Sequence, residues 1–154
     1  MVASAGHRGA DIVLEDPNFE RTTYNPFIAY RRSKTATILF AVEFDRRHSN
    51  RGVRATAVHP GAVVTETTRK LIEAQPSAAS AFTWKTVKQG AATSIWAGFV
   101  APANKVGGRY CEDCRVAEVI DDPAIGFGVR SYALNLKRAQ ALWLKSTEMV
   151  GEQF

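Results

Sequence analysis

Cysteine is scarce in this sequence, and that scarcity excludes a disulfide framework. The 154 residues contain two cysteines, Cys111 and Cys114, in the segment YCEDC. A structural zinc site needs a second close pair of ligands, and His7, His48 and His59 are not paired at ligand spacing. On an extended strand the two cysteine Cα atoms would lie about 10 Å apart, too far for a disulfide. We predict two reduced thiols and no metal; a redox or zinc module built on this pair is the weakest of the functions considered below.

Long apolar runs are also missing. No window approaches the length of about 18 apolar residues that indicates a membrane-spanning helix. The first residues, MVASAGHRGAD, lack the basic segment followed by an apolar run that is typical of a secretory signal. With 45% hydrophobic and 23% charged residues, the composition predicts one globular domain over residues 1–154 in the cytoplasm.

The charge does not indicate a nucleic-acid partner. The formal net charge is +5, but the lysines and arginines are scattered along the chain and are not interleaved with aromatic residues. A nucleic-acid-binding surface would concentrate them. We expect no nucleic acid, no membrane span and a small-molecule partner.

Strand and helix patterns alternate along the chain. The predicted order is a strand end at 2–4, a polar loop at 5–28 with a short strand at 11–15, a helix at 28–47, a strand at 53–60, helices at 66–74 and 83–100, a turn and strand at 105–113, and a C-terminal helix. Ser131 and Asn135 are alternative N-caps of the last helix, and Gly151 follows its end. Alternation predicts an α/β fold with a parallel sheet covered on both faces, although three strands are few for a doubly wound sheet.

Tyr30 and Lys34 are the pair with the clearest chemical meaning. They are four residues apart on the predicted helix and therefore share one face. A phenol has a pKa of about 10, and a cation about 4 Å away stabilises the phenolate by about 4 kcal/mol at an effective dielectric near 20. The spacing suits an acid–base device, but in isolation the default interpretation is a packed tyrosine beside a solvated lysine.

Several segments together resemble one family. YRRSK resembles the Tyr-x-x-x-Lys motif of short-chain dehydrogenases/reductases, MVAS their serine-bearing strand end, and VHPGAVVT their Pro-Gly segment. QGAATSIWAG and GGRYCEDC resemble the later helix and last strand. The long gap between Ser4 and Tyr30, with AGHR and DPNFE inside it, is similar to the retinol-dehydrogenase-like and WW-domain-oxidoreductase-like branch. The resemblance implies the C-terminal half of a Rossmann-like, doubly wound parallel sheet.

The resemblance also implies roles for individual residues. Tyr30 would exchange a proton with a carbonyl or alcohol substrate, Lys34 would support the phenolate and bind the nicotinamide ribose, and Ser4 would contact the substrate oxygen. The cofactor would be NAD or NADP. The implied nicotinamide-binding residues beyond Tyr30 and Lys34 are Pro60, Gly61, Val63 and Thr65. Thr65 should also cap the helix that follows it.

Other features of the family are missing from the sequence. There is no Gly-x-x-x-Gly-x-Gly turn to hold a pyrophosphate, no Asn-Asn-Ala-Gly segment and no asparagine to complete the catalytic tetrad. We therefore expect an NAD(P)-dependent oxidoreductase in truncated form. The alternative is an inactive half-domain that associates with itself or with other chains.

Self-association is expected through the Tyr30-bearing helix. The resemblance implies that the apolar stripe at Leu39, Val42 and Phe44 packs against helices that this sequence does not contain. Without them we expect the stripe to be exposed. Two histidines are expected to be structural and not catalytic. His59 is expected to end a strand. His7 is expected to be a solvated loop residue, with contact to the substrate as the alternative.

Overall fold

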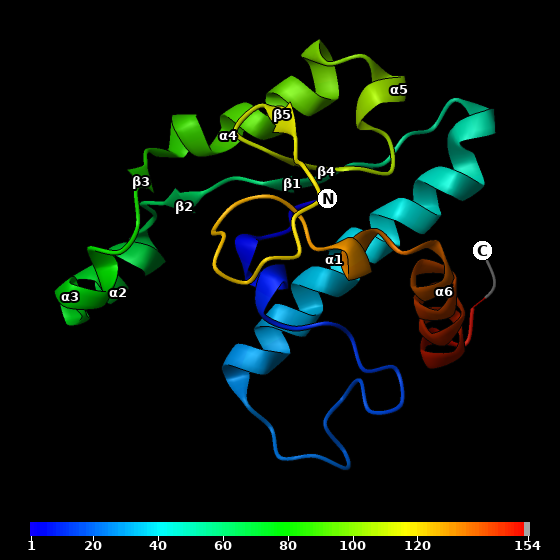
Figure 1. The fold of residues 1–154 in the computed structure, drawn as a ribbon, viewed down its shortest axis with the longest axis horizontal. Helices are drawn as coiled ribbons and strands as arrows, with labels where there is room; N and C mark the ends of the chain where they lie inside the picture. Colours follow the sequence, from blue (N-terminus) through cyan, green and yellow to red (C-terminus); the bar gives the residue numbers. More distant parts are fainter. Residues whose placement is uncertain (153–154) are drawn as a thin grey trace.

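The computed structural model describes residues 1–152 and shows a small sheet between two layers of helices (Figure 1). The α-helices are α1 (Pro26–His48), α2 (Glu66–Ala74), α3 (Pro76–Ala79), α4 (Val87–Ile95), α5 (Ala103–Val106) and α6 (Leu136–Val150). The 3-10 helices are η1 (Ala5–Gly9), η2 (Ser49–Arg51) and η4 (Ser131–Leu134), and η3 (Trp96–Val100) is a π-helix. The strands are β1 (Ala57–His59), β2 (Ala62–Val63), β3 (Trp84–Lys85), β4 (Tyr110–Glu112) and β5 (Arg115–Val116).

The main sheet is mixed. Strand β1 pairs in parallel with β4, and β4 pairs antiparallel with β5. Val2 forms a parallel bridge with Val58 on the other side of β1, and the Ala3 N–H donates to the Val58 carbonyl at 2.8 Å. The predicted strand end at residues 2–4 therefore lies at the free edge of this sheet. A separate parallel pair joins β2 to β3.

Helices cover both faces of the sheet, as the alternation of elements predicted. Ala57 and Tyr110 belong to a core cluster with Ile38 and Ala41 of α1. Val58 and Cys111, the next residues along β1 and β4, pack on the opposite face of the sheet in a cluster with Val106. Successive side chains of a strand point to opposite faces, so this small sheet needs apolar partners above and below.

Helix α1 carries the pair singled out in the sequence. Asn25 caps it by accepting hydrogen bonds from the Phe27 and Ile28 N–H groups at 3.0 and 3.1 Å, and Pro26 occupies the first turn. The helix begins two residues before the predicted start because this cap recruits Pro26 and Phe27.

The expected exposure of the α1 stripe is wrong. Leu39 and Val42 are buried in a cluster with Ile12 and Ala139 of α6, and Phe44 is half-buried against the main core. The reason is that α6 packs along α1 (Figure 1). Periodicity predicted both helices but not their contact.

Three local expectations also need correction. Residues 11–15 form no strand; Ile12 lies in a loop and is buried against Leu39 and Val42 of α1. The predicted helix at 83–100 is split into β3, α4 and η3, since Thr86 caps α4 by accepting from the Gln89 N–H at 3.2 Å. Cys114 does not continue the strand of Cys111: it lies in the β4–β5 turn with a φ of 55°.

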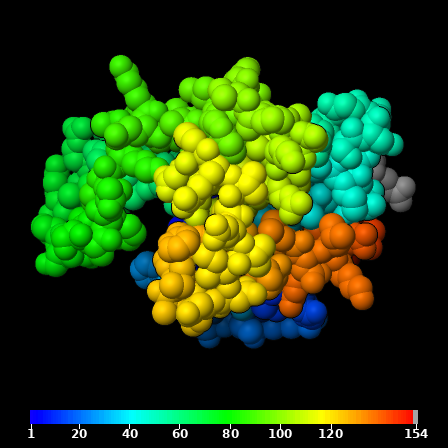
Figure 2. Space-filling model, turned by 45° about the horizontal axis from the view of Figure 1, so that its top comes forward, coloured from blue at the N-terminus to red at the C-terminus, as the bar shows by residue number. Residues whose placement is uncertain are grey.

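Helices α2 and α3 project from the body of the molecule. Neither has a buried residue, and Figure 2 shows them on one side, separated by a hollow from the segment after β4. Within residues 1–152, no helix is both long enough and apolar enough to cross a membrane.

Candidate active site

Ser4 follows the edge segment that pairs with β1. It is the N-cap of η1, and its Oγ accepts a hydrogen bond from the Gly6 N–H at 3.1 Å. Since the oxygen is engaged as an acceptor, the hydroxyl proton remains available for donation to another group. The side chain is half-buried.

Tyr30 projects from the first turns of α1 toward the same place. A Cβ on Gly6 would lie 2.8 Å from Tyr30 Cε1 and 3.5 Å from Ser4 Oγ. The tyrosine ring and the serine hydroxyl therefore flank one point, and the absence of a side chain on Gly6 lets them do so. Tyr30 remains 50% exposed, which leaves room for a ligand beside it.

Lys34 lies one turn farther along α1. Its Nζ is 5.3 Å from the centroid of the Tyr30 ring, over the ring face. An ammonium at this distance interacts favourably with the ring and places a positive charge next to the phenol. The structure thus brings Ser4, Tyr30 and Lys34 together, as the sequence predicted.

His7 organises this corner of the molecule, and the expectation of a solvated histidine is wrong. Its side chain is fully buried; Nδ1 is 2.8 Å from the Ser4 carbonyl oxygen, and Nε2 accepts from the Arg130 N–H at 3.3 Å. These two bonds define a neutral ring protonated at Nδ1. Burial is the main cause that lowers the pKa of His7 to about 4.

The His7 backbone is bound from two further elements. Its carbonyl accepts hydrogen bonds from Thr35 Oγ1 at 3.2 Å and from the Tyr132 hydroxyl at 2.6 Å. These contacts tie η1, and with it Ser4, to α1 and η4. Only the AGHR segment pointed to His7 in the sequence, because its partners lie 28 and 125 residues away.

The Pro60–Gly61 turn ends β1, as predicted. Gly61 has a φ of 87°, a backbone conformation that glycine adopts without strain. The register aligns His59 with Glu112, so Pro60 and Asp113 follow at the same edge, beside Ser4. Carboxyl ends of parallel strands are where open α/β sheets bind ligands.

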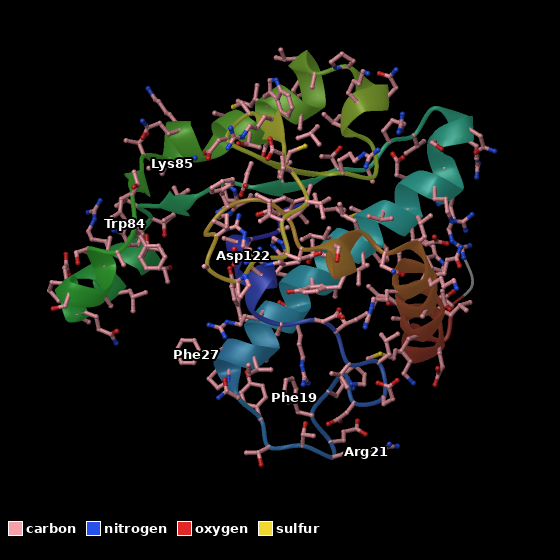
Figure 3. All side chains as sticks on the ribbon, in the orientation of Figure 1. Phe19, Arg21, Phe27, Trp84, Lys85 and Asp122 are labelled. Atoms are coloured by element: carbon pink, nitrogen blue, oxygen red, sulfur yellow. The ribbon has the colours of Figure 1, made fainter. Side chains whose placement is uncertain are left out.

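Lys85 is a neighbour of this turn that the sequence did not indicate. A Cβ on Gly61 would lie 2.7 Å from Lys85 Cδ and 3.0 Å from Nζ, so the lysine stem crosses the turn. Its ammonium forms an ion pair with Asp113 of the β4–β5 turn, and the Lys85 hydrogen bond holds the pKa of Asp113 below its ordinary value. Figure 3 shows Lys85 on the side of the sheet from which α2 and α3 project.

The remaining predicted residues lie in order after this turn. Val63 belongs to β2, and its carbonyl accepts from Thr68 Oγ1 at 2.8 Å. Thr65 caps α2, as expected: its Oγ accepts from the Thr68 N–H at 3.3 Å, and its own N–H donates to Thr68 Oγ1 at 2.7 Å. Both residues thus have structural tasks, and their contact with a cofactor stays a prediction.

His59 stabilises the Pro60–Gly61 turn. Among the described residues, it makes no hydrogen bond to Tyr30 or Lys34. Its Nδ1 accepts from the Gly61 N–H at 3.3 Å. Burial, reinforced by the charges of Arg8 and Lys85, lowers the pKa of His59 to about 4. The assignment of His59 to a strand end is confirmed.

The site fits the nicotinamide end of a dinucleotide. Exposed Tyr30, the Lys34 ammonium and the Pro60–Gly61 turn provide a planar ring, a cation and backbone groups at one sheet edge. The ammonium and the backbone groups can form hydrogen bonds with a carboxamide and a ribose, and the tyrosine ring provides a surface beside them.

Comparisons with known proteins agree on one class. No family model matches the chain. "Oxidoreductase calI" of Penicillium decumbens is 36% identical over 98% of the chain and 47% of its own length. "Short-chain dehydrogenase/reductase prx1" of Penicillium roqueforti is 32% identical over 97% and 45%, and "Retinol dehydrogenase 12" of Mus musculus is 35% identical over 99% and 45%. The chain spans about half the length of the curated relatives it matches.

A solved structure gives the same picture. The crystal structure of an uncharacterised protein from Mycobacterium paratuberculosis superposes with a TM-score of 0.68 and 28% sequence identity, over 99% of this chain and 50% of that one. The similarity in sequence and in fold thus extends over nearly all of this chain.

Proposed function

We propose that this chain, which resembles the C-terminal half of a short-chain dehydrogenase/reductase, forms the proton-transfer side of an NAD(P)-dependent oxidoreductase. The reaction interconverts a carbonyl and an alcohol. The observation that carries the proposal is the meeting of Ser4, Tyr30 and Lys34 around Gly6.

Each of the three side chains has one task in this reaction. The Tyr30 hydroxyl gives a proton to the carbonyl oxygen, or removes it from the alcohol. The Lys34 ammonium stabilises the negative charge left on Tyr30. Ser4 donates a hydrogen bond from its hydroxyl to the substrate oxygen and keeps its proton. The Gly6 N–H and the His7 ring fix the position of Ser4.

NAD or NADP supplies the hydride when bound. On this chain the nicotinamide side would be held by Lys34 and by the segment after β1, with contacts at Pro60, Gly61, Val63 and Thr65. Support comes from the position of this segment at the carboxyl edge of the sheet.

The wider assignment concerns the domain. We propose that residues 1–154 are the C-terminal portion of a single short-chain dehydrogenase/reductase domain whose sheet is Rossmann-like and doubly wound. The half-length matches and the free sheet edge at Val2, which is 60% exposed, support it. Two free thiols fit a reducing compartment and support a cytoplasmic location.

A second function is favoured by one observation. Phe99 and Val100 are 88% and 68% exposed on η3, and Phe27 is 74% exposed at the start of α1. Apolar side chains in such positions favour association. A half-domain without catalytic activity that pairs with itself or with other chains would cover these side chains. On α1, the apolar side chains that remain accessible to a partner are Phe27 and half-buried Phe40.

Turnover by a fusion protein separates the two functions. This chain replaces the matching half of the Penicillium decumbens oxidoreductase, and both the fusion and the free chain are titrated with NADH and NADPH by calorimetry. We expect dinucleotide binding and reduction of aldehydes or ketones by the fusion, and weak or no binding by the free chain. A folded fusion that binds dinucleotide but reduces none of a broad panel, together with a free chain that sediments as an oligomer, would favour the second function.

A further inference from the structure

A cavity lies beside α1, on a different face of the helix from the Tyr30–Lys34 pair. It has a volume of about 320 Å³, between the loop after η1, helix α1 and helix α6. Its apolar wall includes Ile12, Leu14, Phe19, Ala29, Ala36 and Leu142. Ala29, Arg32 and Ala36 recur at helical spacing, so they line one face of α1. The volume is within the range of small-molecule sites, about 300–1,000 Å³.

One charged residue in the lining of this cavity has a guanidinium nitrogen without a hydrogen-bond partner among the described residues. The residue is Arg32, and the nitrogen is its buried Nη1. The guanidinium carbon lies 4.8 Å from the centroid of the Phe19 ring, a favourable stacking contact that satisfies no N–H group. No carboxylate of residues 1–152 forms an ion pair with Arg32. A buried guanidinium N–H requires an acceptor.

The loop wall of the cavity is held in a fixed shape. Both Asp16 oxygens are occupied: Oδ1 accepts from the Glu20 N–H at 2.7 Å, and Oδ2 from the Thr22 hydroxyl at 2.7 Å. Asp16 is therefore committed to the loop backbone and does not neutralise Arg32. Phe19 has a φ of 58°, an unfavourable conformation for a bulky residue. The Asp16 bonds hold this strained turn, which lies below α1 (Figure 3), with the Phe19 ring against the arginine.

We propose that this cavity binds a small amphipathic carboxylate. The carboxylate accepts hydrogen bonds from the Arg32 guanidinium, and the alkyl chain lies along the apolar wall. A planar guanidinium matches a carboxylate in charge and geometry, and the apolar lining favours a hydrocarbon chain. This site is independent of the redox chemistry proposed for Tyr30.

Octanoate and octanol are the probes, titrated into the 154-residue chain with amide NMR as the readout. We expect saturable shifts for octanoate at residues 12–19 and 29–36, and binding of octanol at least about tenfold weaker, since it lacks the charge that pairs with Arg32. Arg32→Gln should weaken octanoate binding about tenfold or more and abolish the preference over octanol. Arg31→Gln, an equal loss of charge at an exposed neighbour outside the cavity, should leave binding unchanged.

Arg32→Lys keeps the charge and guards against a folding defect in Arg32→Gln. It should bind octanoate more weakly than the natural chain but more tightly than Arg32→Gln, because an ammonium lacks the planar pair of donors. Equal binding of octanoate and octanol, equal losses in Arg31→Gln and Arg32→Gln, or shifts that do not saturate would overturn the proposal.

Discussion

Gly6 is a residue at which the Tyr30 side of the candidate active site is closely packed. An alanine methyl at this position would meet the Tyr30 ring at 2.8 Å, which is too close for carbon atoms. We predict that Gly6→Ala displaces the ring from Ser4 and costs about 1 kcal/mol of stability, the lower end of the usual scale of overpacking, because the half-exposed ring can move toward solvent. Thermal unfolding and the NMR shifts of the Tyr30 ring measure the two effects.

Gly98 provides the matched control for this substitution. Outside its own helix, no atom lies within 4 Å of the position of its Cβ. Gly98→Ala should therefore leave the Tyr30 shifts unchanged and should not lower the melting temperature, since alanine is the better helix former. Identical behaviour of the two variants would show that Gly6 does not set the position of the ring.

His7 should make the stability of the protein depend on pH. Burial lowers its pKa from 6.5 to about 4. The unfolded chain therefore binds a proton that the folded chain refuses between these values, and the free energy of unfolding falls as the pH drops through this range. Each pKa unit is worth about 1.4 kcal/mol, so His7 contributes about 3 kcal/mol across it.

Urea unfolding at a series of pH values tests this prediction. His59, whose pKa is also lowered to about 4, should produce a second, similar dependence. His7→Asn should reduce the slope above about pH 5, where carboxyl groups are largely ionised in both states and the buried histidines dominate the dependence. A slope that is unchanged in His7→Asn would be inconsistent with a buried neutral histidine.

At the level of elements, α2 depends on its cap. None of its residues is buried, so packing contributes little, and the reciprocal hydrogen bonds of Thr65 and Thr68 hold its first turn. We predict that Thr65→Ala costs about 1 kcal/mol of local stability, which speeds amide exchange in α2 about fivefold. Thr67→Ala, at an exposed position in the same turn, should not speed exchange; equal effects of both would exclude the cap as the cause.

Elements with strong local signals were predictable from the sequence. Helix α1 has an asparagine cap and a proline at its start. Helix α6 is capped by Asn135 before its first residue and by Gly151, whose φ is 69°, after its last. The missed elements depend on distant contacts. Residues 11–15 look like a strand but bury Ile12 against α1, and the β4–β5 turn puts Cys114 in a left-handed conformation that no local pattern announced.

The candidate site shows the same division. Ser4, Tyr30 and Lys34 could be named in advance, because a recognisable motif fixes their spacing. Gly6, His7 and Lys85 could not, since each acts through a contact between separate segments: with α1, with η4 and with the Gly61 turn. Motif spacing indicated the groups for which we propose chemistry, whereas the groups that position them are identified by packing.

On the scale of the whole molecule, the main sheet has an exposed edge. Its edge at Val2 is paired on one side only among the described residues, and large apolar side chains such as Phe99 are exposed. Relatives about twice as long share the fold of this chain over nearly its entire length. The groups proposed for proton transfer thus lie on a chain about half as long as its relatives, and the proposed activity is best measured with a dinucleotide-binding half attached.

The most direct measurement is kcat for carbonyl reduction by the Penicillium fusion carrying Tyr30→Phe. Tyr24→Phe, the same chemical change at a residue 63% exposed in the loop before α1, is the control. We predict that Tyr30→Phe lowers kcat about a hundredfold or more, the usual scale for removing a general acid, with dinucleotide affinity and melting temperature retained, while Tyr24→Phe keeps the parent rate. Equal kcat values in the two folded variants would contradict the assignment of Tyr30 as the proton donor.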